Sequence, residues 1–245
     1  MYPNALVMLA DDERDASVLS ALESCAEKLG VQTVLLVHVA LTDPLPRGLL
    51  AGIHLPDPPP PAALQEAVER LNAALPGVKV EGKHAVGAPA EVLDDLAKAR
   101  DIDLLVMGRA SASHDGEPAW GPHGRHLLQT ALCSMLVVPM GATLKLDEVV
   151  VGLDFSRLAG ESLLVGATIA DHVVALCQYN TAAAAAGSIT DEEFTTHLLE
   201  AAHRHFDKDL APMLGNLPRP TLELATGDRA SDVLIDRAGE RLLIV

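Results

Sequence analysis

The same pattern of residues occurs twice along this chain of 245 residues, and that repeat constrains the fold more than any other feature. Each copy begins with a short apolar run, a polar break and a helical pattern, and a second apolar run follows. The matching segments are, in order, 7–13 with 148–157, 87–93 with 227–234 and 104–107 with 242–245. We therefore expect two domains, residues 1–142 and 143–245, with the second copy ending one helix and one strand earlier than the first.

The apolar runs indicate strands of a parallel sheet. Residues 33–39, TVLLVHV, are apolar and β-branched without alternation, as expected for a strand that is buried on both faces. Residues 16–29 carry apolar side chains at spacings of three and four, which indicates an amphipathic helix that Gly30 ends. The alternation of strands and helices predicts an α/β fold with a doubly wound parallel sheet in each copy, five strands in the first and about four in the second. Ligands of such sheets bind beyond the C-terminal ends of the strands.

Two helix starts can be located from short motifs. Pro89 follows a glycine and an alanine and suits the first turn of a helix. The longest helical pattern covers residues 190–214, where Thr190 and Glu193 have the spacing of a capping box. The sequence therefore predicts a long helix in the second copy.

Charge and cysteine usage exclude several classes of protein. With 18 basic and 34 acidic residues the net charge is −16, which argues against non-specific binding to nucleic acid or to an anionic membrane. No apolar run approaches the ~20 residues of a membrane span, and the first five residues lack the pattern of a signal peptide. We expect a cytoplasmic protein with no nucleic-acid or membrane partner. Cys25, Cys133 and Cys177 are expected to be reduced core thiols rather than disulfide or zinc ligands.

Several segments together resemble the universal stress protein family. They are the strand at 33–39, Gly87-Ala88-Pro89-Ala90, the segment DLLVMGR at 103–109 and the segment LCSMLVVP at 132–139. Each motif is short, but their order and spacing resemble the family over nearly the whole chain. The resemblance implies the adenine-nucleotide alpha-hydrolase-like fold in two tandem copies, the second of them shortened.

Nucleotide-binding members of that family carry a phosphate loop, G-x2-G-x9-G-[ST], after the fourth strand. Its glycines let backbone N–H groups approach the phosphates. By this resemblance Gly108 and Gly121 have the family spacing, and Arg109 is placed to contact a phosphate. Ser111 stands at the middle glycine position and Pro122 at the [ST] position, where proline removes both a hydroxyl group and an N–H donor.

The family also places an Asp at the end of the first strand, on the adenine side. Ala10 stands there in the first copy, although Asp11 and Asp12 follow directly and the alignment can slip. Asp154 fits the position in the second copy. The tentative nucleotide-binding residues are therefore Gly108, Arg109, Ser111, Gly121, Pro122 and Asp154.

Three of these residues also have a purely structural interpretation. Gly108 suits a turn after a strand, Arg109 a solvated loop charge, and Asp154 the cap of the next helix. The histidines of the polar loop and the long helix lack a carboxylate or cysteine at metal-ligand spacing, so we expect no metal site.

Three functions from different classes follow. The first is a non-catalytic universal stress protein, a stress-response or regulatory module that acts through an unknown protein partner, with nucleotide binding weak or lost and no cofactor required. The alternative is an ATP- or AMP-binding nucleotide sensor, for which Gly108, Arg109 and Gly121 suffice. An ATP-hydrolysing or adenylating enzyme would need an intact phosphate loop and placed acid and base groups, and the sequence offers neither.

The strand at 135–139 predicts how two copies of the chain associate. In the family the last strand of one copy commonly pairs with its equivalent, and this strand has no equivalent in the second copy. An apolar edge strand offers unpaired backbone groups to another chain. We expect a homodimer with a twofold axis, formed through Met135, Leu136, Val137, Val138 and Pro139.

Overall fold

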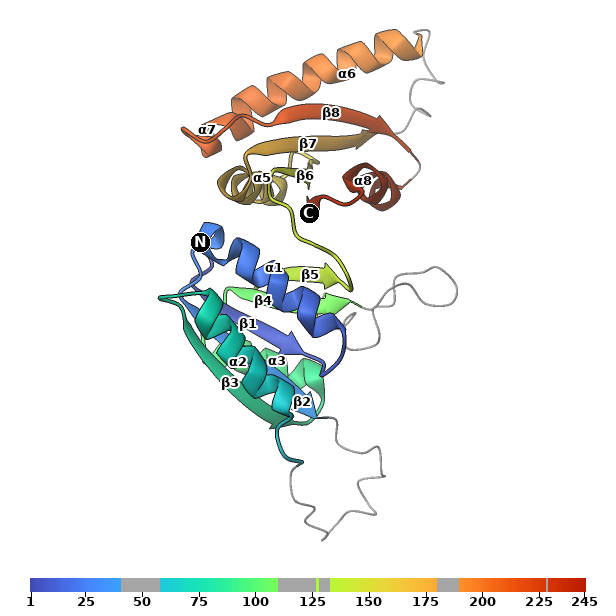
Figure 1. The fold of residues 1–245 in the computed structure, drawn as a ribbon. Coiled ribbons are helices and arrows are strands. Elements are labelled where there is room, and N and C mark those ends of the chain that lie inside the picture. The colour runs from blue at the N-terminus through green and yellow to red at the C-terminus, as the bar shows by residue number, and fades with distance from the viewer. Residues whose placement is uncertain (41–57, 110–126, 128–132, 180–189, 228) are drawn as a thin grey trace. The chain divides into compact units, whose positions relative to one another are not determined.

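The computed structural model describes residues 1–40, 58–109, 127, 133–179, 190–227 and 229–245. The chain divides into two compact units, Met1–Thr143 and Leu144–Val245 (Figure 1). Each unit is built on one sheet whose strands all run parallel, with five strands in the first unit and four in the second. The predicted α/β fold, with doubly wound parallel sheets in two tandem copies, is confirmed.

The first unit alternates strands and helices as the sequence predicts. Its elements are β1 (Asn4–Leu9), α1 (Arg14–Leu29), β2 (Thr33–Ala40), α2 (Ala62–Ala74), β3 (Lys79–Val86), α3 (Pro89–Ala99), β4 (Leu104–Arg109) and β5 (Ser134–Pro139). The strand order is β3-β2-β1-β4-β5, so β3 and β5 are the two edges. Because β1 lies in the middle, the chain reverses direction across the sheet there, which is where doubly wound folds bind ligands.

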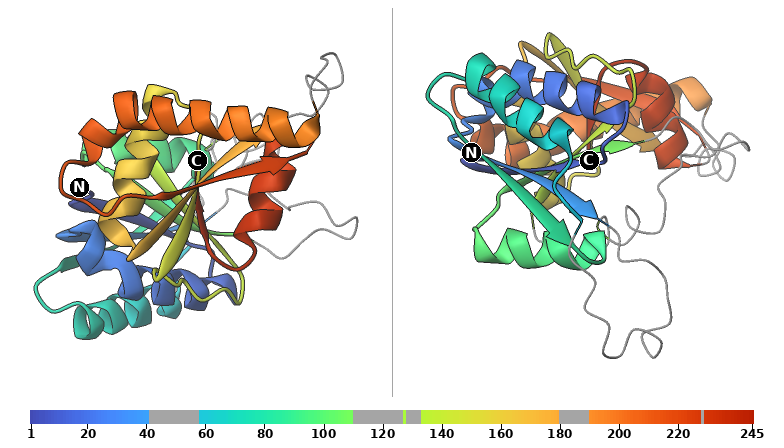
Figure 2. Two further views of the ribbon diagram at one scale, coloured as in Figure 1. Left: turned by 90° about the horizontal axis from the view of Figure 1, so that it is seen from above. Right: turned by 60° about the horizontal axis from the view of Figure 1, so that its bottom comes forward.

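Helices cover both faces of the first sheet (Figure 2). On one face Leu35, Val37 and Leu105 form a buried cluster with Leu93 and Leu96 of α3. The other face lies against α1 and α2. Since successive residues of a strand point to opposite faces, this double burial explains why the strands are apolar without alternation.

The second unit repeats this plan with a different set of helices. Its elements are β6 (Glu148–Gly152), α5 (Arg157–Ile169), β7 (His172–Tyr179), α6 (Asp191–His205), the π-helical turn η2 (Phe206–Leu210), α7 (Ala211–Leu214), β8 (Thr221–Thr226), α8 (Ala230–Ala238) and β9 (Leu242–Ile244). The strand order is β8-β7-β6-β9. Val151 packs against α5 and its neighbour Val150 packs with Ala238 of α8, so these two helices cover opposite faces.

The long helical pattern at 190–214 starts as predicted but does not continue as one regular helix. The capping box is present, because Thr190 Oγ1 accepts the N–H of Glu193 at 3.2 Å and Glu193 Oε2 accepts the N–H of Thr190 at 3.0 Å. At Phe206 the helix passes into a π-helical turn, which accommodates one extra residue. Phe206 and Leu210, the two ends of that turn, are both buried.

Candidate functional site

The C-terminal ends of the strands in the first unit lie along one edge of the sheet. There, β2 and β3 are tied together by a hydrogen bond from the N–H of Gly87 to the carbonyl of Ala40, at 3.0 Å. The turn between β1 and α1 and the last two residues of β4, Gly108 and Arg109, belong to the same edge. Because ligands of doubly wound sheets bind at this edge, these residues define the candidate site.

Gly108 is a strand residue rather than part of a turn. It lies inside β4 opposite Val138 of β5. A Cβ atom at this position would lie 2.9 Å from the Cβ of Arg14 and 3.2 Å from Cγ2 of Val18, both on α1. The close approach of α1 to β4 is therefore a sufficient structural reason for glycine here.

Arg109 is also part of the sheet. It ends β4 opposite Pro139, and its carbonyl accepts the N–H of Met140 at 3.0 Å. Its side chain is half-buried. Arg109 is thus held at the C-terminal end of the interior strand β4 by strand pairing and is not a solvated loop charge.

The turn between β1 and α1 is closed by carboxylates of the chain itself. Asp15 accepts hydrogen bonds from the backbone N–H groups of Ala10, at 2.8 Å, and Asp11, at 2.9 Å. Burial raises the pKa of Asp15, although these two donors act in the opposite direction. Asp12 accepts hydrogen bonds from the side chain of Arg14, which lower the pKa of Asp12. The backbone donors of Ala10 and Asp11 are therefore already occupied.

The backbone of the second unit decides the alignment of the two copies. Asp11, with φ of 57°, and Phe155, with φ of 63°, are left-handed residues in the turns after β1 and β6. Matching these two residues aligns Ala10 with Asp154. The alignment of the two copies therefore does not slip to bring Asp11 or Asp12 to the position of Asp154. The first unit has alanine at the position where the family resemblance expects aspartate, and Asp11 and Asp12 do not replace it.

Asp154 lies exposed at the end of the second unit's central strand β6. Its Oδ1 atom accepts the N–H of Ser156 at 2.8 Å, and its hydrogen bonds with Ser156 lower the pKa of Asp154. The N-cap of α5 is Ser156, whose Oγ accepts the N–H of Ala159 at 3.2 Å. Asp154 thus supports the turn that leads into α5, while the capping position belongs to Ser156.

The remaining residues of the predicted phosphate loop lie outside the described part of the chain. They are Ser111, Gly121 and Pro122. The structure therefore brings Gly108 and Arg109 to the sheet edge near the β1 turn, and Asp154 occupies the corresponding turn of the other unit.

The family model for universal stress proteins matches residues 1–139. The chain belongs to the universal stress protein family. Among solved structures, a universal stress protein from Archaeoglobus fulgidus DSM 4304 aligns over 96% of this chain and 80% of its own, with 15% identity and a TM-score of 0.58. At that identity the likeness concerns the fold, and it extends over both units.

Shorter relatives align with about half of this universal stress protein. One from Archaeoglobus fulgidus is 20% identical over 56% of this chain and 99% of its own, with a TM-score of 0.43. A structure of the universal stress protein from Archaeoglobus fulgidus in complex with dAMP is 18% identical over 56% of this chain and 98% of its own, with a TM-score of 0.39. No curated protein matches the chain.

The described residues of this universal stress protein contain neither a cluster of metal ligands nor a membrane-spanning helix. No group of three or more histidine, cysteine, aspartate or glutamate side chains there is arranged to hold a metal ion. No helix within the same described ranges is long and apolar enough to cross a membrane.

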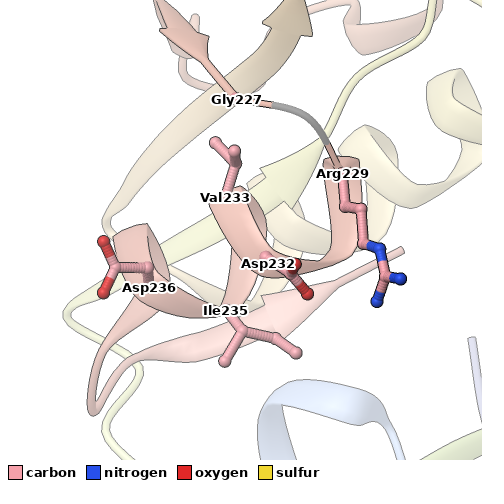
Figure 3. Close-up of a pocket in the computed structure, with 6 residues that line it drawn as sticks. All are labelled: Gly227, Arg229, Asp232, Val233, Ile235 and Asp236. Carbon is pink, nitrogen blue, oxygen red and sulfur yellow. The ribbon is translucent and has the colours of Figure 1, made fainter.

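An open pocket lies at the start of α8 in the second unit (Figure 3). Its lining residues are Gly227, Arg229, Asp232, Val233, Ile235 and Asp236. In Figure 3 the side chains of Arg229, Val233 and Asp236 point in different directions rather than toward a common centre. We assign no ligand to this pocket.

Sequence reasoning missed one pair of polar side chains at the edge of the first sheet. His38 of β2 and His84 of β3 are register partners, and their Nδ1 atoms are 3.1 Å apart. Each is the third residue from the end of an eight-residue strand. That common position was the available signal, but it becomes informative only once β2 and β3 are known to be neighbours.

Proposed function

We propose that this universal stress protein is a non-catalytic stress-response module that acts through protein contacts and binds adenine nucleotides weakly or not at all. The observation that carries the proposal is the turn after β1. Ala10 offers no carboxylate to an adenine ring, and its N–H group is bound by Asp15. In the sequence, Ser111 and Pro122 replace phosphate-loop residues and act in the same direction.

Electrostatics supports the same proposal. A nucleotide carries negative phosphates, and the β1 turn presents Asp11, Asp12 and Asp15 within five residues. Arg14, the cation of this turn, forms an ion pair with Asp12. Like charges repel each other. A phosphate near this turn would therefore meet repulsion from the carboxylates as well as occupied backbone donors.

Calorimetric titration with ATP and with AMP tests the proposal. We expect no saturable heat at micromolar nucleotide, and we expect the double change Ser111→Gly with Pro122→Ser to increase the affinity by restoring backbone approach and a hydroxyl donor. Ser113→Gly with Pro118→Ser is the matched control, since it makes the same changes off the motif. Micromolar ATP binding by the unmodified protein would contradict the proposal.

The absence of catalysis is part of the proposal and has its own test. Nucleotide hydrolysis needs a bound phosphate and a positioned acid or base, and the carboxylates of Asp12 and Asp15 in the β1 turn are engaged by Arg14 and by backbone donors. We expect steady-state phosphate release from ATP to equal the rate in buffer. A rate above buffer that disappears with Gly108→Val would instead indicate an enzyme.

A nucleotide sensor is the second candidate, and Asp154 favours it. This exposed carboxylate stands where the family resemblance expects the adenine contact, and another universal stress protein has been solved in complex with cAMP. If the second unit is a sensor, Asp154→Asn abolishes AMP binding while Asp171→Asn, a control at another exposed aspartate of the same unit, leaves it intact. Under the leading proposal neither variant changes the titration.

We infer that the protein contact includes a homodimer through β5. This strand is an edge of the first sheet, and β4 is its only strand partner among the described residues. Met135, Leu136 and Val137 are half-buried. An apolar edge with unpaired backbone groups favours pairing with a second copy across a twofold axis.

The mass in solution tests this dimer. We expect light scattering after size exclusion to give twice the chain mass of 25.8 kDa at micromolar concentration. Val137→Lys should produce the monomer, whereas Thr221→Lys, at the start of the edge strand β8, should leave the dimer intact. A monomeric mass for the unmodified protein would contradict the proposal.

A further inference from the structure

The imidazole rings of His38 and His84 face each other edge to edge. Their planes differ by only 9°, their centroids are 5.2 Å apart and their Nδ1 atoms are 3.1 Å apart. The nitrogens are thus closer than the centroids by nearly two ring radii. That difference is possible only if each Nδ1 points at the other ring, so both in-plane Nδ1 positions open into one gap.

Both rings lie on the α2 side of the sheet, near its C-terminal edge. Val37, the neighbour of His38, belongs to the buried cluster on the α3 side, so His38 points to the opposite face. Gly82 lies two residues before His84 and faces side chains of α2. His84 therefore shares that face with His38.

The strand pairing itself does not require two imidazoles. The N–H of Gly227 donates to the carbonyl of Tyr179, just as Gly87 donates to Ala40, so the two units can be matched at this point. The residues that correspond to His38 and His84 are then Cys177 and Leu224, which are register partners in β7 and β8. A thiol and an apolar side chain serve in the second unit, so the imidazole pair is a chemical feature of the first unit.

The pair is incompletely satisfied as a hydrogen-bonded unit. One Nδ1 can donate a proton to the other, which leaves the two Nε2 atoms to find other partners. The Nε2 atom of His84 is buried and has no hydrogen-bond partner among the described residues. This Nε2 atom is not a ligand in the site proposed below: a metal bound at Nδ1 leaves the ring proton on Nε2.

We propose that His38 and His84 bind a divalent first-row transition-metal ion through their two Nδ1 atoms. Metal–nitrogen bonds of 2.0–2.1 Å at angles between square and tetrahedral place two ligand nitrogens about 2.8–3.4 Å apart. The observed 3.1 Å lies within that range. The metal takes the place of the proton shared by the two rings and lies to one side of the line that joins the two nitrogens.

The chemistry of the pair favours Cu²⁺, followed by Zn²⁺. Imidazole suits both ions, and Cu²⁺ binds more tightly at a given nitrogen site. In the described part of the chain no third protein ligand joins the pair, so water completes the coordination. A net charge of −16 raises the local concentration of cations at the surface.

Titration of the full chain with Cu²⁺, followed by calorimetry and electron paramagnetic resonance, tests the proposal. We expect one Cu²⁺ with two coordinated imidazole nitrogens in the unmodified protein. His84→Leu, which introduces the residue that the second unit has at this position, and His38→Leu should each weaken binding at least tenfold and leave fewer coordinated nitrogens. His203→Leu, at an exposed histidine of α6, is the control and should change neither result.

Equal affinity and equal spectra for the unmodified protein and His84→Leu would overturn the proposal, as would a loss of binding only in His203→Leu. Circular dichroism checks that the variants fold. A second measurement needs no variant: Zn²⁺ added to protein with ¹⁵N-labelled histidine should shift the Nδ1 resonances of His38 and His84. Unchanged Nδ1 resonances at saturating Zn²⁺ would also overturn the proposal.

Discussion

The turns after β1 and after β6 share a left-handed residue but are held by different side chains. In both, a non-glycine residue adopts a left-handed conformation, Asp11 in one unit and Phe155 in the other. The first turn is held by Asp15, which reaches back to two N–H groups, and the second by Asp154 and Ser156. The comparison teaches that this turn requires a carboxylate or hydroxyl oxygen for its backbone donors but not at any one position of the sequence.

The same contrast appears further along the sheet edge. Gly87 and Gly227 close equivalent hydrogen bonds, while the histidine pair of the first unit is replaced by Cys177 and Leu224. The shared backbone of the fold therefore leaves the residues at the C-terminal ends of its strands free to differ. Each unit must then be judged by its own side chains when a function is assigned.

The largest expected effect tests whether the two units are independent. Phe206→Ala removes a fully buried aromatic ring from the second unit, which should lower the free energy of unfolding by about 3–5 kcal/mol. Hydrogen exchange measured by mass spectrometry should show lost protection in β6 to β9 and none in β1 to β5. Leu22→Ala, at a fully buried position of α1, is the matched control and should show the reverse. Equal loss in both units would contradict their independence.

Gly108→Ala probes the close approach of α1 to β4. The new Cβ would meet the Cβ of Arg14, which cannot rotate away, so we expect a loss of about 1–3 kcal/mol in denaturant unfolding. Gly166→Ala in the second unit is the comparison, because its Cβ would meet terminal methyl groups: Cγ2 of Val151 at 2.9 Å, Cγ2 of Val149 at 3.4 Å and Cδ1 of Ile244 at 3.6 Å. Alanine also favours the helix at that position, so its effect should be smaller. A neutral Gly108→Ala would leave the packing explanation of this glycine without support.

Asp15→Ala tests the carboxylate that closes the β1 turn. Two backbone N–H groups lose their acceptor, which should cost about 1–2 kcal/mol at neutral pH. Glu13→Ala is the control, since this exposed neighbour makes no side-chain capping bond. Thermal unfolding of the two variants at pH 7 gives the comparison. If both variants unfold like the unmodified protein, the turn does not depend on Asp15.

The smallest expected effect is a pH dependence from Asp12. Its pKa is lowered in the folded protein, so it stabilises the fold above the ordinary aspartate value of about 3.9 and loses this contribution as pH falls through its folded pKa. The ion pair is partly exposed, so we expect less than about 1 kcal/mol. Asp12→Asn should therefore differ from the unmodified protein at pH 7 and match it in strong acid. Asp154→Asn should show the same sign in the second unit.

Asp15 should respond to pH in the opposite sense. Because burial raises its pKa in the folded protein, the pH-dependent part of its contribution is largest below the ordinary aspartate value and is lost as pH rises through the folded pKa, whereas its hydrogen bonds to Ala10 and Asp11 persist at neutral pH. Comparing Asp15→Asn with Asp12→Asn between pH 3 and pH 7 separates the two carboxylates. The same sign in both variants would contradict the assignment of desolvation at Asp15.

Much of the fold could be predicted because its signals are local or repeated. Gly30 ends α1 in a left-handed conformation, with φ of 72°, and Pro89 occupies the first turn of α3. The capping box of Thr190 and Glu193 forms as its spacing indicates. The candidate site was less predictable: the sequence pointed to Gly108 and Arg109 for a phosphate, but it could not indicate that strand pairing and α1 hold them.

The sequence by itself determined the repeat, the parallel α/β class and several helix ends, because apolar periodicity and capping act between residues only a few positions apart. Only the tertiary structure decided which side chains meet. Gly108 is constrained by Arg14 of α1, a helix that is distant in sequence but close in space. His38 likewise meets His84 across 46 residues of sequence. Strand register and helix docking create these contacts, and both depend on the packing of the whole unit rather than on local sequence.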